Sequence, residues 1–234
     1  AGKTDKNGEL TVPEVEQTER HGVYIVGYTD GTFGPSRSMT RSEAAAIFAR
    51  LLAEKNGDTI STAANTKFAD IPAHAWYSGY VKYLSNNGIT YGKSKTIFAP
   101  NDAITRAEFT TMAVRFFDVY GDGDAEIMEQ FSGFNDVSSG YWAAEYIKYA
   151  ALHGWINGYG DGSFHADREI NRAEVVTIVN RLLGREADED YIADNLRKLN
   201  TFPDVTKRHW AYYAVMEAAN AHTAVLGESE SWSK

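Results

Sequence analysis

The chain lacks cysteine: none occurs among its 234 residues. This absence excludes disulfide bonds, thiolate metal sites and cysteine nucleophiles, and it suits an exported protein that needs no redox chemistry. Long apolar runs are also missing, because no segment between Leu10 and Leu226 approaches the roughly 20 apolar residues that span a bilayer. No basic and hydrophobic leader follows Ala1, so we expect any export signal to have been removed or to lie elsewhere. The sequence predicts no membrane insertion.

Basic residues are too few for a nucleic-acid binder. Acidic residues outnumber them, and the formal net charge is −9. A protein that tracks phosphates needs a basic stripe, so we exclude nucleic acid as a partner. The chain is 43% hydrophobic, which at this length allows a sizeable core in one large domain or in several small units.

The chain does contain a four-residue signature in three copies. The arginine of each copy stands at position 41, 106 or 172, so the copies are 65 and 66 residues apart. A fixed period of this kind indicates that one structural unit has been copied, and a site built on the unit should recur. The three copies are Thr40-Arg41-Ser42-Glu43, Thr105-Arg106-Ala107-Glu108 and Asn171-Arg172-Ala173-Glu174.

Each signature is expected to begin a helix. Apolar residues follow it with a helical period, as at Ala44, Phe48 and Leu51 in the first copy. The first residue of the signature is a good N-cap, and the glutamate three positions later completes a capping box. A triplicated glutamate could also be catalytic, but capping already accounts for it. The predicted capping residues are Thr40, Glu43, Thr105, Glu108, Asn171 and Glu174.

A glycine-rich loop precedes each signature. Asp-Gly forms a tight turn before an aromatic anchor, and an exposed loop can also present its aspartate and backbone amides to ligand hydroxyls. Copy two has Lys93 and Lys95 in place of the Tyr and the Asp. We therefore expect copy two to be inactive or to prefer a more anionic ligand, and we favour copies one and three. Their loops read Gly27-Tyr28-Thr29-Asp30-Gly31-Thr32-Phe33 and Gly158-Tyr159-Gly160-Asp161-Gly162-Ser163-Phe164.

A third block carries one tryptophan per copy, at Trp76, Trp142 and Trp210, after a Phe-x-Asp turn. A large aromatic at one register of a helix is either a core anchor or, when exposed beside an arginine, a platform for a sugar ring, and the sequence leaves both open. The first signature has no such block upstream, and the last block has no signature after it. We infer that the C-terminal segment packs beside the first loop and completes a ring of three units.

These three blocks together resemble the S-layer homology (SLH) domain family of bacterial cell-surface proteins. The resemblance covers about residues 21–222, and three ordered blocks in register are far more specific than one tetrapeptide. It implies a mainly α, pseudo-threefold assembly of three SLH repeats with short loops, closed by the C-terminal helix. It also implies a noncatalytic module of the extracellular cell wall or S-layer, whose grooves between repeats bind a wall glycan, often through a pyruvylated sugar.

The expected boundaries follow from the order of the blocks. We predict an N-terminal lead-in over 1–20, repeat two over 66–120, repeat three over 132–185 and a connector over 186–201. Repeat one covers 21–60 and is completed by the closing Trp helix of 202–222, after which 223–234 is a flexible tail. Acidic stretches at 5–9 and 122–124 hint at calcium loops but lack the spacing of an EF-hand, so we interpret them as surface acidity.

The signature arginines stand where positive charge opposes the helix macrodipole. A solvated arginine or a surface ion pair would contribute little there. Recurrence at an unfavourable position indicates a role, and the guanidinium fork matches a carboxylate bidentately near a helix N-terminus. A pyruvyl ketal carries such a carboxylate, and lysine should not replace the fork. The predicted ligand-binding residues are Arg41, Arg106, Arg172, Trp76, Trp142, Trp210, Gly27, Tyr28, Asp30, Gly31, Gly158, Tyr159, Asp161 and Gly162.

Other repeated or titratable residues receive simpler interpretations. A second arginine row lies nine positions along each helix, about half a turn from the first, and is expected to face solvent or to pair between units. The six histidines share no register, so no metal site, cofactor or proton-transfer site is predicted. The second arginine row is Arg50, Arg115 and Arg181.

Two rivals to glycan anchoring remain open. The grooves or outer faces could mediate self-assembly of a surface lattice, or bind modified peptidoglycan instead of a carboxylate-bearing polysaccharide. A glycan-cleaving enzyme built on a carboxylate pair is disfavoured because every repeated glutamate has a capping role. We expect a monomeric pseudo-trimer that binds a cell-wall polysaccharide without catalysis.

Overall fold

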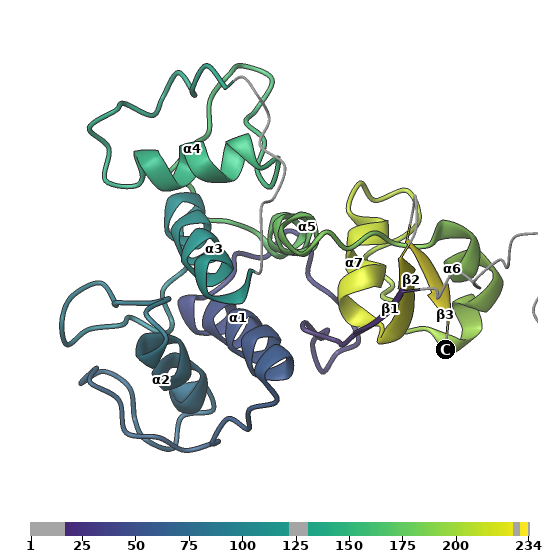
Figure 1. Ribbon diagram of the computed structural model, residues 1–234, viewed down its shortest axis with the longest axis horizontal. Helices are drawn as coiled ribbons and strands as arrows, with labels where there is room; N and C mark the ends of the chain where they lie inside the picture. Colours follow the sequence, from purple (N-terminus) through teal and green to yellow (C-terminus); the bar gives the residue numbers. More distant parts are fainter. Residues whose placement is uncertain (1–16, 122–130, 227–229, 234) are drawn as a thin grey trace, which may run out of the picture.

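The computed structural model describes residues 17–121, 131–226 and 230–233. This part of the chain is mainly α, with one small sheet (Figure 1). A 3-10 turn, η1 (Leu196–Lys198), follows the sixth helix. The helices are α1 (Arg41–Asn56), α2 (Ser78–Asn86), α3 (Arg106–Tyr120), α4 (Ala144–Leu152), α5 (Arg172–Leu183), α6 (Glu189–Asn195) and α7 (Tyr212–Ala219). The strands are β1 (Gln17–His21), β2 (His222–Leu226) and β3 (Ser231–Ser233).

The three signature helices, α1, α3 and α5, form the centre of the assembly, and each packs against one Trp-block helix. The pairs are α1 with α2, α3 with α4 and α5 with α7, and Figure 1 shows α5 end-on between α3 and α7. Buried aromatics fill the contact between α1 and α3, where the ring centroids of Phe48 and Phe109 are 5.3 Å apart. The predicted mainly α, pseudo-threefold arrangement is confirmed.

The signature helices begin where their capping residues stand. At Thr40 the hydroxyl accepts from the Glu43 N–H at 3.2 Å, while Glu43 Oε2 accepts from the Thr40 N–H at 2.8 Å. The same capping box is present at Thr105 and Asn171. The first two helical N–H groups are also occupied: Arg41 and the following serine donate to carbonyls of Asp102 and Pro100 in the next repeat. The helix N-termini therefore offer no spare donors to a ligand anion.

A closed triangle of backbone hydrogen bonds marks the pseudo-threefold axis. The N–H of Met39 donates to Ile170 at 3.0 Å, that of Ile170 to Ile104 at 3.0 Å, and that of Ile104 to Met39 at 2.9 Å. Each residue stands two positions before a signature arginine and is fully buried. The three repeats thus meet through main-chain atoms in one repeating register.

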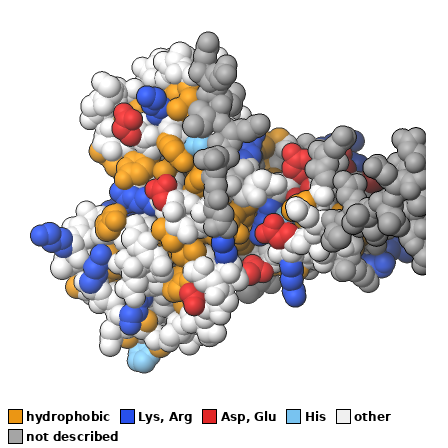
Figure 2. Space-filling model, in the orientation of Figure 1, with side chains coloured by type: hydrophobic (Ala, Val, Ile, Leu, Met, Phe, Trp, Pro, Cys, Tyr) orange, Lys and Arg blue, Asp and Glu red, His pale blue; other side chains and the backbone are white. Residues whose placement is uncertain are grey.

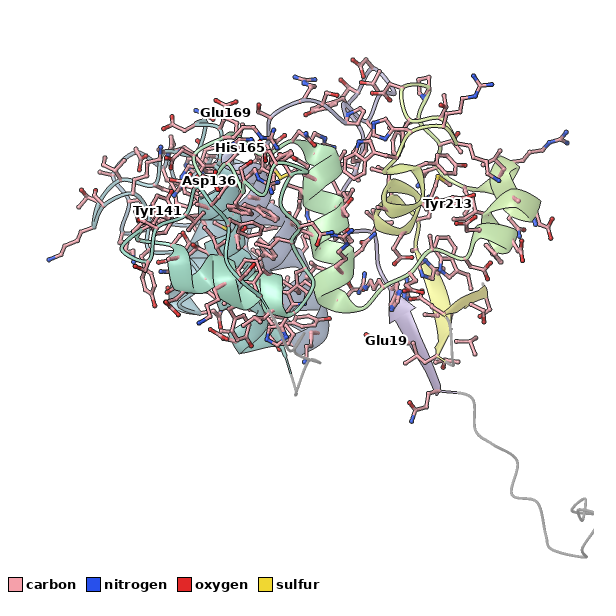
Figure 3. All side chains as sticks on the ribbon, turned by 90° about the horizontal axis from the view of Figure 1, so that it is seen from above. Glu19, Asp136, Tyr141, His165, Glu169 and Tyr213 are labelled. Carbon is pink, nitrogen blue, oxygen red and sulfur yellow. The ribbon has the colours of Figure 1, made fainter. Side chains whose placement is uncertain are left out.

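The C-terminal segment completes the first repeat, as expected. The Asp204 carboxylate accepts from the N–H groups of Phe33 at 2.9 Å and Gly34 at 2.7 Å. The Phe202 ring lies 5.3 Å from that of Phe33, and a Cβ on Gly27 would lie 2.4 Å from the Phe202 ring. Asp70 and Asp136 hold loops two and three in the same way, and Figure 3 shows Asp136 close to its loop partner His165.

The predicted flexible tail is wrong for the described residues after 222. Strand β1 pairs antiparallel with β2, which pairs antiparallel with β3, in a register that places His21 opposite His222. Only alternate residues of β2, such as His222 and Ala224, are buried. The segment is therefore polar in composition, and the strands were not predicted from the sequence. The rest of the tail, the lead-in before residue 17 and the acidic stretches at 5–9 and 122–124 lie outside the described residues.

The connector is not wholly irregular. It contains α6, capped by Asp188, whose side chain accepts from the Tyr191 N–H at 2.8 Å.

Acidic and basic side chains are interspersed on the face shown in Figure 2. None of the helices in the described part of the chain combines the length and apolar character required to cross a membrane.

Candidate functional site

Three grooves recur at the boundaries between repeats. Each is lined by a signature arginine, the loop and capping glutamate of the next repeat, an arginine of the second row and one tryptophan. Their cavity volumes are about 220, 100 and 230 Å³ for grooves 1, 2 and 3. We define groove 1 by Arg172, Tyr28, Glu43, Arg50 and Trp76, groove 2 by Arg41, Tyr91, Glu108, Arg115 and Trp142, and groove 3 by Arg106, Tyr159, Glu174, Arg181 and Trp210.

Each signature arginine lies in the groove of the following repeat. Arg172 of the third copy donates from Nε to Phe33 O at 2.8 Å and from Nη2 to Val26 O at 2.7 Å, both in the first loop. Its side chain is only 4% exposed. Its Nη1 lies 3.9 Å from Glu43 Oε1, at the limit of an ion pair.

The other two arginines make the same contact around the ring. Arg41 Nε donates to Phe98 O at 2.8 Å, and Arg106 Nε donates to Phe164 O at 2.9 Å. Each also pairs with the capping glutamate of the next helix, at 3.2 Å in groove 2 and 3.3 Å in groove 3. The repeat pattern alone did not indicate this role: the signature arginine clamps one repeat to the next, and this contact within the fold accounts for its recurrence.

Burial changes the pKa of two of these arginines but not their charge. Burial lowers the pKa of Arg106 and of Arg172, and in each case a nearby tyrosine and glutamate oppose the shift. A guanidinium stays protonated at any physiological pH, so each groove keeps this positive charge. With two arginines to one glutamate among its lining side chains, each groove is locally positive on an acidic molecule.

The three tryptophans are exposed groove walls rather than core anchors. Trp76, Trp142 and Trp210 are 53%, 57% and 66% exposed, although each lines a groove. A core role is excluded by this exposure. Trp210 borders groove 3, so the C-terminal segment contributes its Phe-x-Asp turn to loop one and its tryptophan to a different groove.

The second arginine row also lines the grooves. Nine positions place Arg50 on the opposite side of α1 from Arg41, which made a shared site look unfavourable. The side chain of Arg41, however, lines groove 2 rather than groove 1. Groove 1 is lined by Arg50 of α1 and Arg172 of α5. Arg115 lies over the Tyr146 ring at 4.9 Å and donates to its hydroxyl from Nη2 at 3.1 Å.

The loop tyrosines of copies one and three lie in their grooves under an arginine. Arg37 stands 4.0 Å from the centre of the Tyr28 ring, and Arg168 donates to the hydroxyl of Tyr159. At the equivalent positions of copy two, Lys93 and Asp102 form an ion pair at 2.9 Å. Copy two has therefore exchanged an aromatic–cation pair for a salt bridge.

Groove 2 contains a tyrosine that alignment of the copies did not reveal. Tyr91 stands two positions before Lys93, the residue in register with Tyr28, and Arg115 lies 4.8 Å from its ring centre. Tyr91 lines groove 2, which is the smallest of the three grooves. Arg41 in this groove uses Nε and Nη1, while its Nη2 forms no hydrogen bond within the described residues.

The loop aspartates serve their own turns. Asp30 Oδ1 accepts from the hydroxyl of Thr32 at 2.7 Å and from its N–H at 2.9 Å, and these bonds lower the pKa of Asp30. Asp161 makes the equivalent bonds with Ser163, and its pKa is lowered for the same reason. Gly27 and Gly158 line grooves 1 and 3, whereas Asp30, Gly31, Asp161 and Gly162 are not among the lining residues, and their ligand role stays a prediction.

A separate group of side chains could hold a metal ion. His21, Glu217, His222 and Glu230 converge beside the sheet, outside the residues that line the grooves. The histidines were set aside at the sequence level because they share no repeat register. A site that occurs only once, where the two ends of the ring meet, produces no repeated pattern in the sequence.

Three helical repeats closed into a ring, with one groove at each boundary, define a repeat-built module with a triplicated groove. The family model for the S-layer homology domain matches residues 11–45, 67–110 and 133–176, together more than half of the chain. The chain therefore belongs to the S-layer homology domain family.

Curated relatives agree with this assignment. The chain is 34% identical over 218 residues to "Cell surface glycoprotein 1" of Acetivibrio thermocellus, covering 90% of this chain and 9% of that protein. It is 30% identical over 229 residues to the "Cellulosome-anchoring protein" of the same organism, covering 97% of this chain and 48% of that protein. It is also 32% identical over 163 residues to the "Surface-layer 125 kDa protein" of Lysinibacillus sphaericus, covering 68% of this chain and 13% of that protein. The chain thus spans half or less of these relatives, which place it at the bacterial cell surface.

Proposed function

We propose that this module anchors its protein to the bacterial cell wall by binding an anionic wall polysaccharide, expected to be pyruvylated, in the grooves between repeats. The observation that carries the proposal is the recurrence, in all three grooves, of an exposed tryptophan beside one buried arginine and one partly or fully exposed arginine. An indole face at a groove edge suits a sugar ring, and a guanidinium suits a carboxylate.

The charge of the grooves supports an acidic ligand. In groove 1, Arg172 and Arg50 face a single glutamate, Glu43, so the groove retains one positive charge to offset an incoming carboxylate. Groove 1 also has the longest distance between a signature arginine and its capping glutamate, because Arg172 Nη1 is 3.9 Å from Glu43 Oε1. A ligand carboxylate at Nη1 would therefore displace little protein structure.

The grooves are not equivalent, and we expect grooves 1 and 3 to bind more tightly than groove 2. Grooves 1 and 3 have about twice the volume of groove 2, and each presents the loop tyrosine that copy two lacks. In groove 2 the side chains of Tyr91 and Arg115 occupy part of this space.

The repeated glutamates support a noncatalytic role. One oxygen of each carboxylate caps its helix, as Glu108 Oε2 does with the Thr105 N–H at 3.1 Å, and the other faces a signature arginine. Glycoside hydrolysis generally requires two carboxylates flanking the scissile bond. The lining of each groove contains a single glutamate and no aspartate.

The test should alter exposed groove residues and leave the clamp intact. We would measure binding of purified wall glycan, native and depyruvylated, by calorimetry to the wild type, to a Trp76→Ala/Trp210→Ala variant and to Trp142→Ala as the matched control. The double variant should lose about tenfold in affinity or more, the control should lose little, and depyruvylation should weaken binding to all.

Other results would point to the rival functions. Unchanged binding by the double variant would contradict the groove proposal. Absence of glycan binding together with concentration-dependent association in sedimentation would favour a lattice-forming module. Binding of modified peptidoglycan but not of the polysaccharide would keep the anchor and change its ligand.

A further inference from the structure

Four ionisable side chains converge in a buried cluster where the two ends of the ring meet. His21 ends β1, Glu217 comes from α7, His222 begins β2 and Glu230 stands just before β3. Glu217 is fully buried, and the side chains of the other three are 2–4% exposed. In Figure 3 this sheet, on which Glu19 is labelled, lies apart from the central helices, next to α7.

The five nitrogen–nitrogen and nitrogen–oxygen separations within the cluster are close to those of a tetrahedral metal site. His21 Nδ1 is 3.1 Å from His222 Nε2, 3.3 Å from Glu217 Oε1 and 3.2 Å from Glu230 Oε1. His222 Nε2 is 3.3 Å from Glu217 Oε2 and 3.2 Å from Glu230 Oε1. Four ligands at zinc bond lengths stand about 3.3 Å from one another at the corners of a tetrahedron. All four ligand atoms lie within 4.8 Å of one another.

Surrounding groups hold these ligands in place. His222 Nδ1 is 3.0 Å from Asn220 O, so that with its proton on Nδ1 it presents the Nε2 lone pair to the cluster. The Trp232 ring stacks on His222 at 3.8 Å, and Trp232 Nε1 donates to Glu230 Oε1 at 3.1 Å. The Glu186 N–H donates to Glu230 Oε2 at 2.9 Å. Orientation by such outer contacts is typical of metal-binding histidines and carboxylates.

The Glu217 carboxylate is a second, independent observation that favours a cation at this cluster. Both of its oxygens are buried and accept no hydrogen bond within the described residues, and each lies 3.3 Å from a histidine nitrogen. A buried carboxylate without hydrogen bonds is strongly unfavourable unless a positive charge lies against it. The nearby Arg185 is also buried, and its single positive charge offsets only one of the two glutamates.

We propose that His21, Glu217, His222 and Glu230 form a structural site for a divalent transition metal ion of the zinc type. Two nitrogens and two carboxylate oxygens suit zinc, whereas calcium and magnesium prefer oxygen ligands alone. Four protein ligands leave no open position for a substrate, as in structural rather than catalytic zinc sites. The ion would join the first strand to the last helix and the C-terminal strands, and so fasten the ring that the C-terminal segment closes.

The experiment uses the full chain without a polyhistidine tag, stripped of metal with a chelator. Zinc titration by calorimetry should give one equivalent per chain, and Co²⁺ should produce the intense visible absorption of tetrahedral coordination. Tryptophan fluorescence should change because Trp232 stacks on a ligand. The midpoint of thermal unfolding should rise by roughly 5–10 °C at a zinc concentration about one hundred times the dissociation constant, while Ca²⁺ and Mg²⁺ have no effect.

Matched variants connect these signals to the cluster. Glu217→Gln and His222→Gln should each lose zinc binding, and His74→Gln, which alters an exposed histidine, should retain it. A folded wild type that binds neither zinc nor cobalt overturns the proposal without reference to any variant, and leaves a network of protonated histidines and glutamates. Equal binding by the wild type and a folded Glu217→Gln variant, judged by circular dichroism, overturns it as well.

Discussion

Arg172 donates from Nε to the carbonyl of Phe33 at 2.8 Å, across 139 residues of sequence. This bond joins the last signature helix to the first loop. Together with its equivalents at Arg41 and Arg106, it makes the assembly a ring in which every repeat is clamped by its predecessor. Each groove is therefore assembled from two repeats, and a change in one signature affects the groove of the next.

Replacing Arg172 should lower the free energy of unfolding, because its side chain holds two repeats together. Arg172→Ala removes hydrogen bonds to two carbonyls and the long contact with Glu43, which we expect to cost about 3 kcal/mol. Arg172→Lys keeps the charge but loses the fork, and should recover only part of this free energy of unfolding. Urea unfolding measures both, with the exposed Arg208→Ala as the control. Wild-type stability in Arg172→Ala would contradict the clamp.

Loop one should tolerate no side chain at Gly27. A Cβ there would lie 2.4 Å from the Phe202 ring and 2.8 Å from Thr32 O, so Gly27→Ala should lower the free energy of unfolding by about 2 kcal/mol. Gly140→Ala is the matched control, because a Cβ at Gly140 meets nothing within 4 Å. Thermal unfolding compares the two. Equal midpoints would mean that the C-terminal turn does not hold loop one in solution.

The exchanged pair in copy two should behave as a coupled unit. Lys93→Tyr and Asp102→Arg together would recreate the aromatic–cation pair of the other copies, whereas either change alone leaves a partner unmatched. Both side chains are well exposed, so we expect a coupling energy of only about 0.5–1 kcal/mol in a double-mutant cycle. The same double variant tests whether groove 2 then gains glycan affinity. Additive single effects would show that the two positions act independently.

Acid should loosen the Phe-x-Asp turns. Burial alone would raise the pKa of Asp136, but the N–H groups of Phe164 and His165 hold it below the ordinary value of 3.8. A carboxylate whose pKa is depressed by folding stabilises the fold above its unfolded pKa, and that contribution is lost as pH falls through the folded value. The thermal midpoint should therefore hold from pH 7 to about pH 5 and fall below about pH 4.

Asp136→Asn tests this assignment. The variant should be less stable than the wild type at neutral pH and should show a smaller loss on acidification, because one of the titrating carboxylates is gone. Asp194→Asn, an exposed change in α6, is the control. An acid profile for Asp136→Asn that parallels the wild type would assign the pH dependence to other carboxylates.

Local chemistry made much of the fold predictable from sequence. The capping residues, the Asp-Gly turns and the unpaired first and last blocks indicated where helices begin and how the C-terminal segment closes the ring. Comparison of copies could not show that Arg172 contacts loop one, because alignment pairs equivalent residues, whereas this contact joins non-equivalent residues of two different copies. Tyr91 was missed because it stands two positions out of register, and His21 and His222 were missed because their contact spans 201 residues without any repeat.

The triangle formed by Met39, Ile104 and Ile170 has a consequence for how such modules diversify. Its donors and acceptors are main-chain atoms, so the register of the three repeats does not depend on which side chains surround it. The loop side chains of each repeat can then change independently, as the Lys93–Asp102 pair of copy two shows. A polymer with several kinds of substituent along its length could be held at three unlike points by one chain, and loss of one point would leave the other two engaged.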